Sequence, residues 1–124
     1  AIVKNSAREA GIPLVPFARL LYKESKYDKD AINVNRNGTK DVGIAQFNNK
    51  YYADFVWFDN GGVKFDPLDP FVAIPVAARY VARLYRATGS WWMAFAAYEC
   101  GLSRVRSGDI PSATRASADW VLGY

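Results

Sequence analysis

The stretch KESKYDKDAINVNRNGTKDVGIAQFN, residues 23–48, sets the architecture of this chain, because a helical pattern gives way to a hairpin pattern within it. Phe17 and Leu20 lie seven and four residues before Glu24, so Glu24 continues the apolar face of a helix over residues 14–25. Partial burial on such a face disfavours the ionised carboxylate and raises its pKa. This spacing leaves two interpretations open for Glu24: a solvated charge at a helix end, or a catalytic acid.

Turn-forming residues dominate the second part of this stretch. Asn37-Gly38 is a strong signal for a tight turn, and the short polar alternation around it predicts a small hairpin between Asp28 and Val42. The following segment, GIAQFNNKYYADFVWF at residues 43–58, is rich in aromatic residues, and we expect it to be helical in part. The hairpin is therefore expected to lie between two helical segments.

Local start and stop signals predict helices through the rest of the chain. Asp69 and Pro70 suit the N-cap and first turn of a long helix, although Pro75 should delay its regular hydrogen bonding until about Ile74. Ser90 is expected to cap an almost wholly apolar helix that must be central. The predicted helices cover residues 2–10, 14–25, 70–88 and 91–100, with a short turn or helix over 102–108 and a last helix within 112–124. The fold class is thus α+β, predominantly helical, with a small β-hairpin after the second helix.

Composition argues against several classes of function. The 124 residues suffice for one domain, residues 1–124, and 51% of them are hydrophobic. The absence of His and the single Cys100 argue against a zinc site and an internal disulfide, and no apolar run approaches the roughly 20 residues of a membrane span. The net charge of +4 would favour a polyanion, yet Arg79, Arg83 and Arg86 are the only basic group at helical spacing. We interpret these three as a solvated helix face and expect no nucleic-acid partner.

Three motifs, in the right order, carry a resemblance that covers nearly the whole chain. Residues 24–48 resemble the catalytic stretch of the lysozyme superfamily, in which Glu-Ser ends a helix, a hairpin follows and a Gly-x-x-Gln segment returns. The segment AFAAYECGLSRV, residues 94–105, resembles the Ala-Ala-Tyr-Asn-Ala-Gly segment of lytic transglycosylases with a soluble-transglycosylase (SLT) domain. The tail IPSATRASADWV, residues 110–121, is similar to that family's closing Thr-Arg-x-Tyr-Val helix. The resemblance implies a lysozyme-like catalytic domain that cleaves the β-1,4 bond between MurNAc and GlcNAc in peptidoglycan and needs no metal or organic cofactor.

The hairpin leaves the type of reaction open. It is similar to that of animal-type lysozymes and of specialised secretion-system transglycosylases, because Asp41 lies on the outgoing strand at the lysozyme-like separation from Glu24. The resemblance to lytic transglycosylases implies that Glu24 acts first as acid and then as base, with help from the 2-acetamido group, and leaves 1,6-anhydroMurNAc ends. The resemblance to lysozymes implies hydrolysis with Asp41 as second carboxylate. Asp41 could also serve the turn alone, by bonding its own backbone.

The same resemblance assigns further site residues. Ser25 is expected to brace the catalytic carboxylate or the substrate, Gln46 matches an amide that contacts sugar, and Tyr98 matches a Tyr whose hydroxyl can reach the catalytic Glu. Tyr51 and Tyr52 are candidates to stack on sugar rings. Each has a structural alternative, as a helix-end Ser, a surface amide or a core aromatic residue.

The chain departs from the family pattern at Glu99 and Cys100, where transglycosylases have Asn and Ala. The missing Asn removes one expected sugar contact, and Glu99 would bring a second negative charge near the site. This departure keeps another class of function open, a catalytically silent module that binds glycan. In either class the expected partners are peptidoglycan glycan strands, and the domain is expected to act as a monomer. The substrate places it in the periplasm, at the cell surface or in a phage particle.

Overall fold

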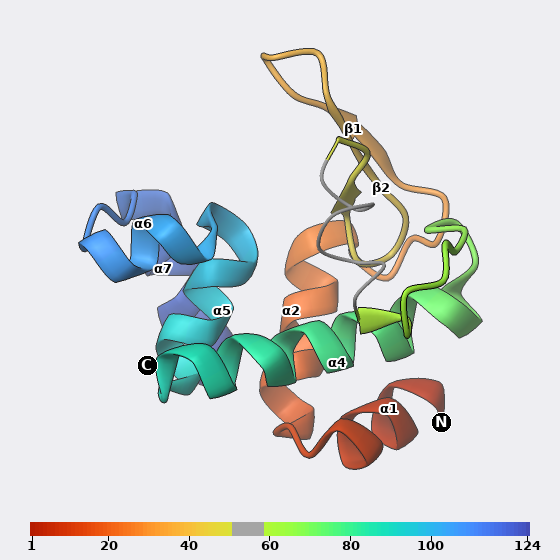
Figure 1. The fold of residues 1–124 in the computed structure, drawn as a ribbon, viewed down its shortest axis with the longest axis horizontal. Coiled ribbons are helices and arrows are strands. Elements are labelled where there is room, and N and C mark those ends of the chain that lie inside the picture. The colour runs from red at the N-terminus through yellow and green to blue at the C-terminus, as the bar shows by residue number, and fades with distance from the viewer. Residues whose placement is uncertain (51–58) are drawn as a thin grey trace.

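Figure 1 shows the computed structural model of the protein, which describes residues 1–50 and 59–124. Helix α4 crosses the molecule, α1 packs along one side of it, and the β-structure stands on the other side. Helices α5 to α7 gather at the C-terminal end of α4. The described helices are α1 (Ile2–Ala10), α2 (Leu14–Ser25), α4 (Pro70–Thr88), α5 (Trp91–Cys100), α6 (Leu102–Ser107) and α7 (Ser112–Leu122).

Helix α2 confirms the predicted apolar face. Phe17, Leu20 and Leu21 are buried, and the helix ends at Ser25, one residue after Glu24. The chain leaves the helix through Lys26, which takes a left-handed φ of 55° and lets its N–H reach the carbonyl of Tyr22. Glu24 is therefore held in the last turn of a helix whose buried face anchors it in the core.

A three-stranded antiparallel sheet follows α2, in the order β1-β2-β3. Its strands are β1 (Ile32–Val34), β2 (Lys40–Val42) and β3 (Phe47–Asn48). The predicted hairpin is confirmed. In the segment 43–58, expected to be helical in part, residues 43–46 form a turn that leads into β3, and residues 51–58 lie outside the described residues. The turn has a local cause, because Gly43 and Gln46 both have positive φ, 82° and 56°, which a right-handed helix excludes.

Pro75 does not delay helix α4. The side chain of Asp69 accepts a hydrogen bond from the N–H of Phe71, and the N–H of Ala73 already bonds the carbonyl of Asp69 at 2.8 Å. Regular hydrogen bonding thus begins before Ile74, contrary to our prediction. Pro75 removes only one N–H donor from the helix, the one that would bond the carbonyl of the exposed residue Phe71.

Helix α5 is the central helix, as its apolar sequence predicts. Ser90 caps it, and Ala94, Phe95, Ala96 and Ala97 are all buried. It packs against α4, α6 and α7. In the described part of the chain, no helix is both long and apolar enough to cross a membrane.

Candidate active site

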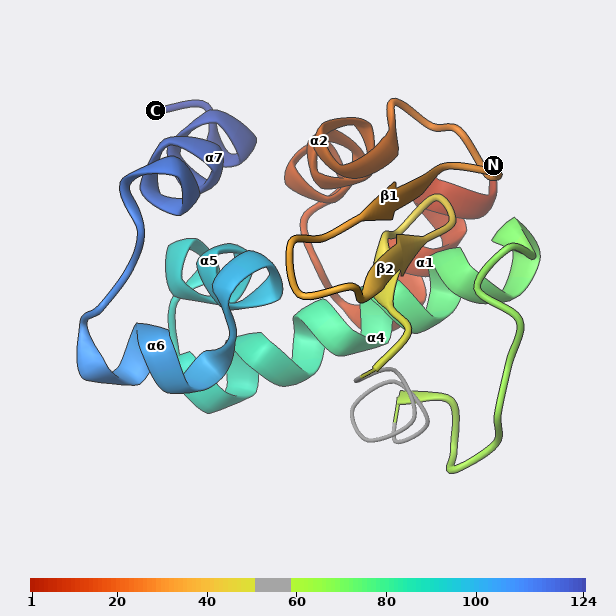
Figure 2. The same ribbon diagram turned by 90° about the horizontal axis from the view of Figure 1, so that it is seen from above.

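A cavity of about 840 Å³ lies between the β-sheet and the corner formed by α5 and α6. Figure 2 shows these two parts facing each other above α4. The cavity brings together four of the predicted site residues, Glu24, Asp41, Gln46 and Tyr98, and it adds others. Its polar lining includes Glu24, Asp41, Gln46, Asn48, Tyr98 and Glu99.

Glu24 has the properties of an acid catalyst. Its side chain is partly buried, and no group in the described ranges donates a hydrogen bond to its carboxyl or forms an ion pair with it. Burial, followed by the negative charges of Glu99 and Asp41, raises its pKa from 4.5 to about 8, while Lys23 opposes the shift. The carboxyl is therefore protonated at neutral pH and free to meet a ligand in the cavity.

The raised pKa predicts a pH-dependent stability. Between pH 4.5 and about 8 the unfolded chain has lost the Glu24 proton and the folded chain still holds it, so wild-type stability falls as pH rises through this window. Glu24→Gln removes this term and should be more stable than wild type at pH 8, by roughly 2 kcal/mol after discounting for partial exposure, and equal near pH 4. Urea unfolding across this range measures the difference. Parallel curves for the two proteins would contradict the raised pKa.

Asp41 lies in the middle of β2, half-buried, and faces the same cavity as Glu24. It pairs with Asn33 on β1 and with Asn48 on β3, and its Oδ1 accepts a hydrogen bond from Nδ2 of Asn48 at 3.1 Å. Among the described residues its carboxylate bonds this neighbouring side chain and not its own backbone, so the sheet helps to orient it. This position is compatible with electrostatic support of a cation in the cavity and with attack on it.

Two hydrogen bonds tie the Gly43–Gln46 return to the helices around it. The hydroxyl of Ser25 donates to the carbonyl of Ile44 at 2.7 Å, and the hydroxyl of Tyr98 donates to the carbonyl of Ala45 at 2.8 Å. Burial and then the charge of Glu24 raise the pKa of Tyr98 well above its usual value, so this hydroxyl stays a donor. In this structure, both predicted residues brace the return segment and do not hydrogen-bond Glu24.

Gln46 lines the cavity, but its amide is already engaged. Its Nε2 donates to the carbonyls of Gly43 and Ala31 at 2.9 and 3.1 Å, and its Oε1 accepts from Nδ2 of Asn33 at 2.8 Å. The amide therefore joins β1 to the return segment. Contact with sugar at this position remains a prediction, as does stacking by Tyr51 and Tyr52, which lie outside the described residues.

Arg83 does not lie on the solvated helix face that its spacing predicts. It lines the cavity and forms a paired contact with the buried Asp59, in which Nε and Nη2 reach the two carboxylate oxygens at 2.9 Å. Its guanidinium also lies 5.0 Å from the ring centre of Tyr80, a second cavity residue. The interpretation of a solvated helix face is wrong for Arg83, and because Asp59 lies 24 residues away, no local spacing could have revealed the pair.

The far end of the cavity is built by the turn from α5 into α6. Cys100 is half-buried there, and burial raises the pKa of its thiol, which argues against a role as nucleophile.

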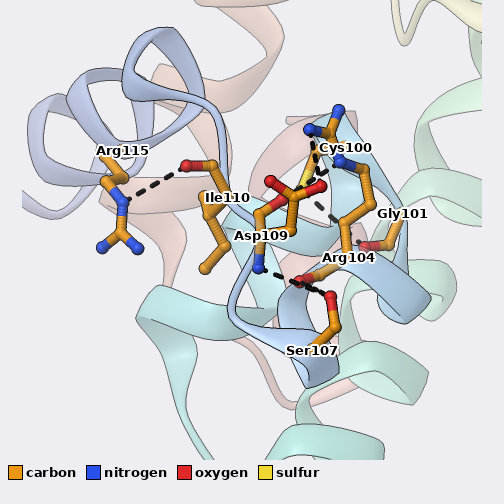
Figure 3. Close-up of polar contacts among 7 residues, drawn as sticks. All are labelled: Cys100, Gly101, Arg104, Ser107, Asp109, Ile110 and Arg115. Carbon is orange, nitrogen blue, oxygen red and sulfur yellow. Dashed lines mark hydrogen bonds and ion pairs between the residues drawn. The ribbon is translucent and has the colours of Figure 1, made fainter.

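Figure 3 shows that the guanidinium of Arg104 in α6 donates two hydrogen bonds to Asp109, one to the carboxylate at 3.1 Å and one to the backbone carbonyl at 3.0 Å. The contact fastens α6 to the segment before α7. Across the described ranges, no group of three His, Cys, Asp or Glu side chains is arranged to hold a metal ion.

Comparison with known families agrees with this geometry. The sequence model of the family described as Transglycosylase SLT domain matches residues 2–119. The chain belongs to this family. The predicted lysozyme-like fold and SLT-domain resemblance are thereby confirmed, and Glu24 and Tyr98 fall within the matched range.

Individual relatives point the same way. The chain is 30% identical to protein IpgF of Shigella flexneri over 95 residues, which cover 74% of this chain and 60% of that protein. It is 39% identical to lysozyme c-1 of Anopheles gambiae over 54 residues, 44% of this chain and 37% of that protein. An inactive Glu-to-Gln mutant of the lytic transglycosylase Slt from Pseudomonas aeruginosa has the same fold, with a TM-score of 0.77 at 21% identity. That match covers 97% of this chain and 22% of Slt, so the chain spans only part of each of these relatives.

Proposed function

We propose that this domain is a peptidoglycan lytic transglycosylase that cleaves the β-1,4 bond between MurNAc and GlcNAc with Glu24 as acid and base. The observation that carries the proposal is the Glu24 carboxyl at the end of α2, whose pKa is raised to about 8 and which has no hydrogen-bond or ion-pair partner among the described residues, in a cavity of about 840 Å³. Membership of the Transglycosylase SLT domain family supports the choice of substrate. Glycan strands of peptidoglycan are the proposed partner, and residues 1–124 are proposed to act as a single, monomeric catalytic domain.

In the first step Glu24 donates its proton to the oxygen that leaves with GlcNAc, and the bond from C1 of MurNAc to that oxygen breaks. Positive charge builds on the MurNAc ring, where the 2-acetamido group of the substrate and the negative charge of Asp41 can stabilise it. General acid catalysis contributes about 10² to 10⁴ in rate. The raised pKa of Glu24 ensures that the proton is present at neutral pH.

In the second step the C6 hydroxyl of the same MurNAc attacks C1, and the Glu24 carboxylate removes the proton from that hydroxyl. The new bond closes the 1,6-anhydro ring and returns Glu24 to its protonated state, so atoms and charge balance without water. The same environment serves both steps, because a carboxylate that burial and two negative charges destabilise is also a stronger base.

The position of Asp41 favours one alternative, a hydrolytic muramidase. Its carboxylate is fixed on β2 by Asn48 and faces the cavity that Glu24 faces. In that reaction Asp41 would attack or stabilise C1 and water would complete the turnover. A catalytically silent glycan-binding module is the other alternative, to which Glu99 in place of the family's Asn lends support.

Product analysis separates these functions. Purified murein digested with the wild-type domain should yield muropeptides with anhydro ends, each lighter by one water than the reducing ends that hydrolysis leaves. Asp41→Asn should slow the reaction and still give anhydro ends. Mass spectrometry reads both outcomes. Reducing ends in the bulk product would overturn lytic transglycosylation, and undigested murein that nevertheless binds the domain would identify a silent module.

The substrate also implies where the domain works. Peptidoglycan lies outside the cytoplasmic membrane, so we propose action in the periplasm, at the cell surface or from a phage particle that penetrates the wall. The proposal rests on the substrate class alone.

A further inference from the structure

We propose that Glu99 is a positioning residue that keeps the proton on Glu24 and so readies this cleft for acid catalysis at neutral pH. Glu99 stands where the family resemblance expects an amide. The inference rests on the proposed function and deepens it, since it assigns a role to a residue that departs from the family pattern.

The placement of Glu99 is the first support. It is the next-to-last residue of α5, directly after Tyr98, and it lines the same cavity as Glu24 and Asp41. Three carboxyl groups thus face one cavity from three different elements, α2, β2 and α5. A like charge close to a carboxyl disfavours its ionised form.

The carboxylate of Glu99 has no hydrogen bond or ion pair in the part of the chain that the structure describes. Arg104 lies in the next helix, α6, but its guanidinium is bound to Asp109, as Figure 3 shows. Arg83, on the cavity wall, is bound to the buried Asp59. The negative charge of Glu99 therefore acts on the cavity with no ion-pair partner among the described residues.

The remaining charged and titratable groups around Glu24 do not replace this effect. From α2 itself Lys23 lowers the pKa of Glu24, and from β2 Asp41 raises it less than Glu99 does. From α4 Tyr80 lines the cavity, and from α5 Tyr98 and Cys100 line it. Burial raises the pKa of both phenols and of the thiol, so all three are neutral. Helices α1 and α7 also pack on α2, but none of their described titratable side chains lines the cavity.

The chain offers an unusually direct test, because it contains three Glu residues in all: Glu9, Glu24 and Glu99. In protein labelled with ¹³C at the glutamate carboxyls, three signals can be followed by NMR and assigned from single Glu→Gln variants. Glu9 is exposed on α1, outside the cavity, so E9Q makes the same change in net charge as E99Q and serves as the matched control.

We expect the Glu24 signal of wild type to titrate near pH 8, and the midpoint in E99Q to lie at lower pH than in E9Q. Glu99→Asp, which keeps the charge, should retain part of the wild-type midpoint. Because Glu99 is exposed, the difference between E99Q and E9Q should shrink at about 0.5 M salt, where charges are strongly screened. Equal Glu24 midpoints in E99Q and E9Q would overturn the proposal.

The pH profile of murein digestion gives the second readout. The alkaline limb of E99Q should move to lower pH, with the rate at pH 8 about twofold lower relative to the rate at pH 6 than in E9Q. An alkaline limb that stays in place while the Glu24 midpoint falls would also overturn the proposed effect of Glu99 on catalysis. The two failures are distinguishable: the NMR midpoint needs no turnover, so an inactive domain refutes the proposed function and leaves the Glu24–Glu99 coupling measurable.

Discussion

Replacing Glu24 by Gln is expected to lower the initial rate of murein solubilisation by about 10² to 10⁴, the range that a general acid supplies. Gln has the size and shape of Glu but cannot donate the proton that the leaving oxygen requires, and it cannot accept the proton of the C6 hydroxyl afterwards. Both chemical steps fail at once. The loss of turbidity of a murein suspension measures the rate, with wild type and variant at equal concentration.

The variant should lose its activity without losing its fold. Because the raised pKa of Glu24 costs stability above pH 4.5, Glu24→Gln is expected to unfold at a higher urea concentration than wild type at pH 7 to 8. If the variant digests murein more slowly than wild type but is more stable, the defect lies in the chemical steps and not in the fold. Glu9→Gln is the matched control, since it makes the same substitution on α1 and should keep the wild-type rate. If Glu24→Gln and wild type clear murein equally fast, Glu24 is not the catalyst.

The helices were predictable because their signals are local. A glycine that takes positive φ follows the last residue of α1 at Gly11 and of α4 at Gly89, and a polar cap precedes α4 at Asp69 and α5 at Ser90. Such signals lie within four residues of the boundary they set. Strand β3 has two residues, too few for any alternation to be read, and its pairing with β2 depends on a turn whose shape Gln46 completes with a positive φ.

The site was predictable in part for the same reason. Glu24 could be found because its neighbours on α2 are apolar at helical spacing, and the order of three motifs then pointed to its chemistry. The cavity wall could not be predicted, because the Arg83–Asp59 ion pair joins residues 24 positions apart and the Tyr98–Ala45 hydrogen bond joins residues 53 positions apart. The sequence also left undetermined which groups Ser25 and Gln46 would contact, and both turned out to bind backbone carbonyls around the return segment.

That return segment begins at a glycine whose replacement should have the largest effect on stability. Gly43 has a φ of 82°, and a Cβ added to it would lie 1.9 Å from the carbonyl oxygen of Pro67. A left-handed conformation costs an Ala about 1–2 kcal/mol, and here the backbone before α4 must move as well. We expect Gly43→Ala to lower the free energy of unfolding by about 3 kcal/mol or more.

Gly38, in the β1–β2 turn, provides the matched control. Its φ is 83°, nearly that of Gly43, but nothing lies within 4 Å of an added Cβ. Gly38→Ala therefore carries the conformational cost alone, about 1–2 kcal/mol, and urea unfolding of both variants isolates the contact with Pro67. Equal losses would show that this contact is not kept in solution.

The damage at Gly43 should extend to the active site. Its N–H bonds the carbonyl of Ala31 at 2.8 Å, and its carbonyl accepts from the backbone and the side chain of Gln46 at 3.1 and 2.9 Å. A shift at Gly43 would thus pull the carbonyls of Ile44 and Ala45 away from Ser25 and Tyr98, the bonds that fix the sheet against α2 and α5. The rate of murein digestion by Gly43→Ala should fall well below that of Gly38→Ala. Both rates are measured without urea, at a temperature where the Gly43→Ala variant is still folded. A folded Gly43→Ala variant with the full rate would show that the position of the return segment does not control catalysis.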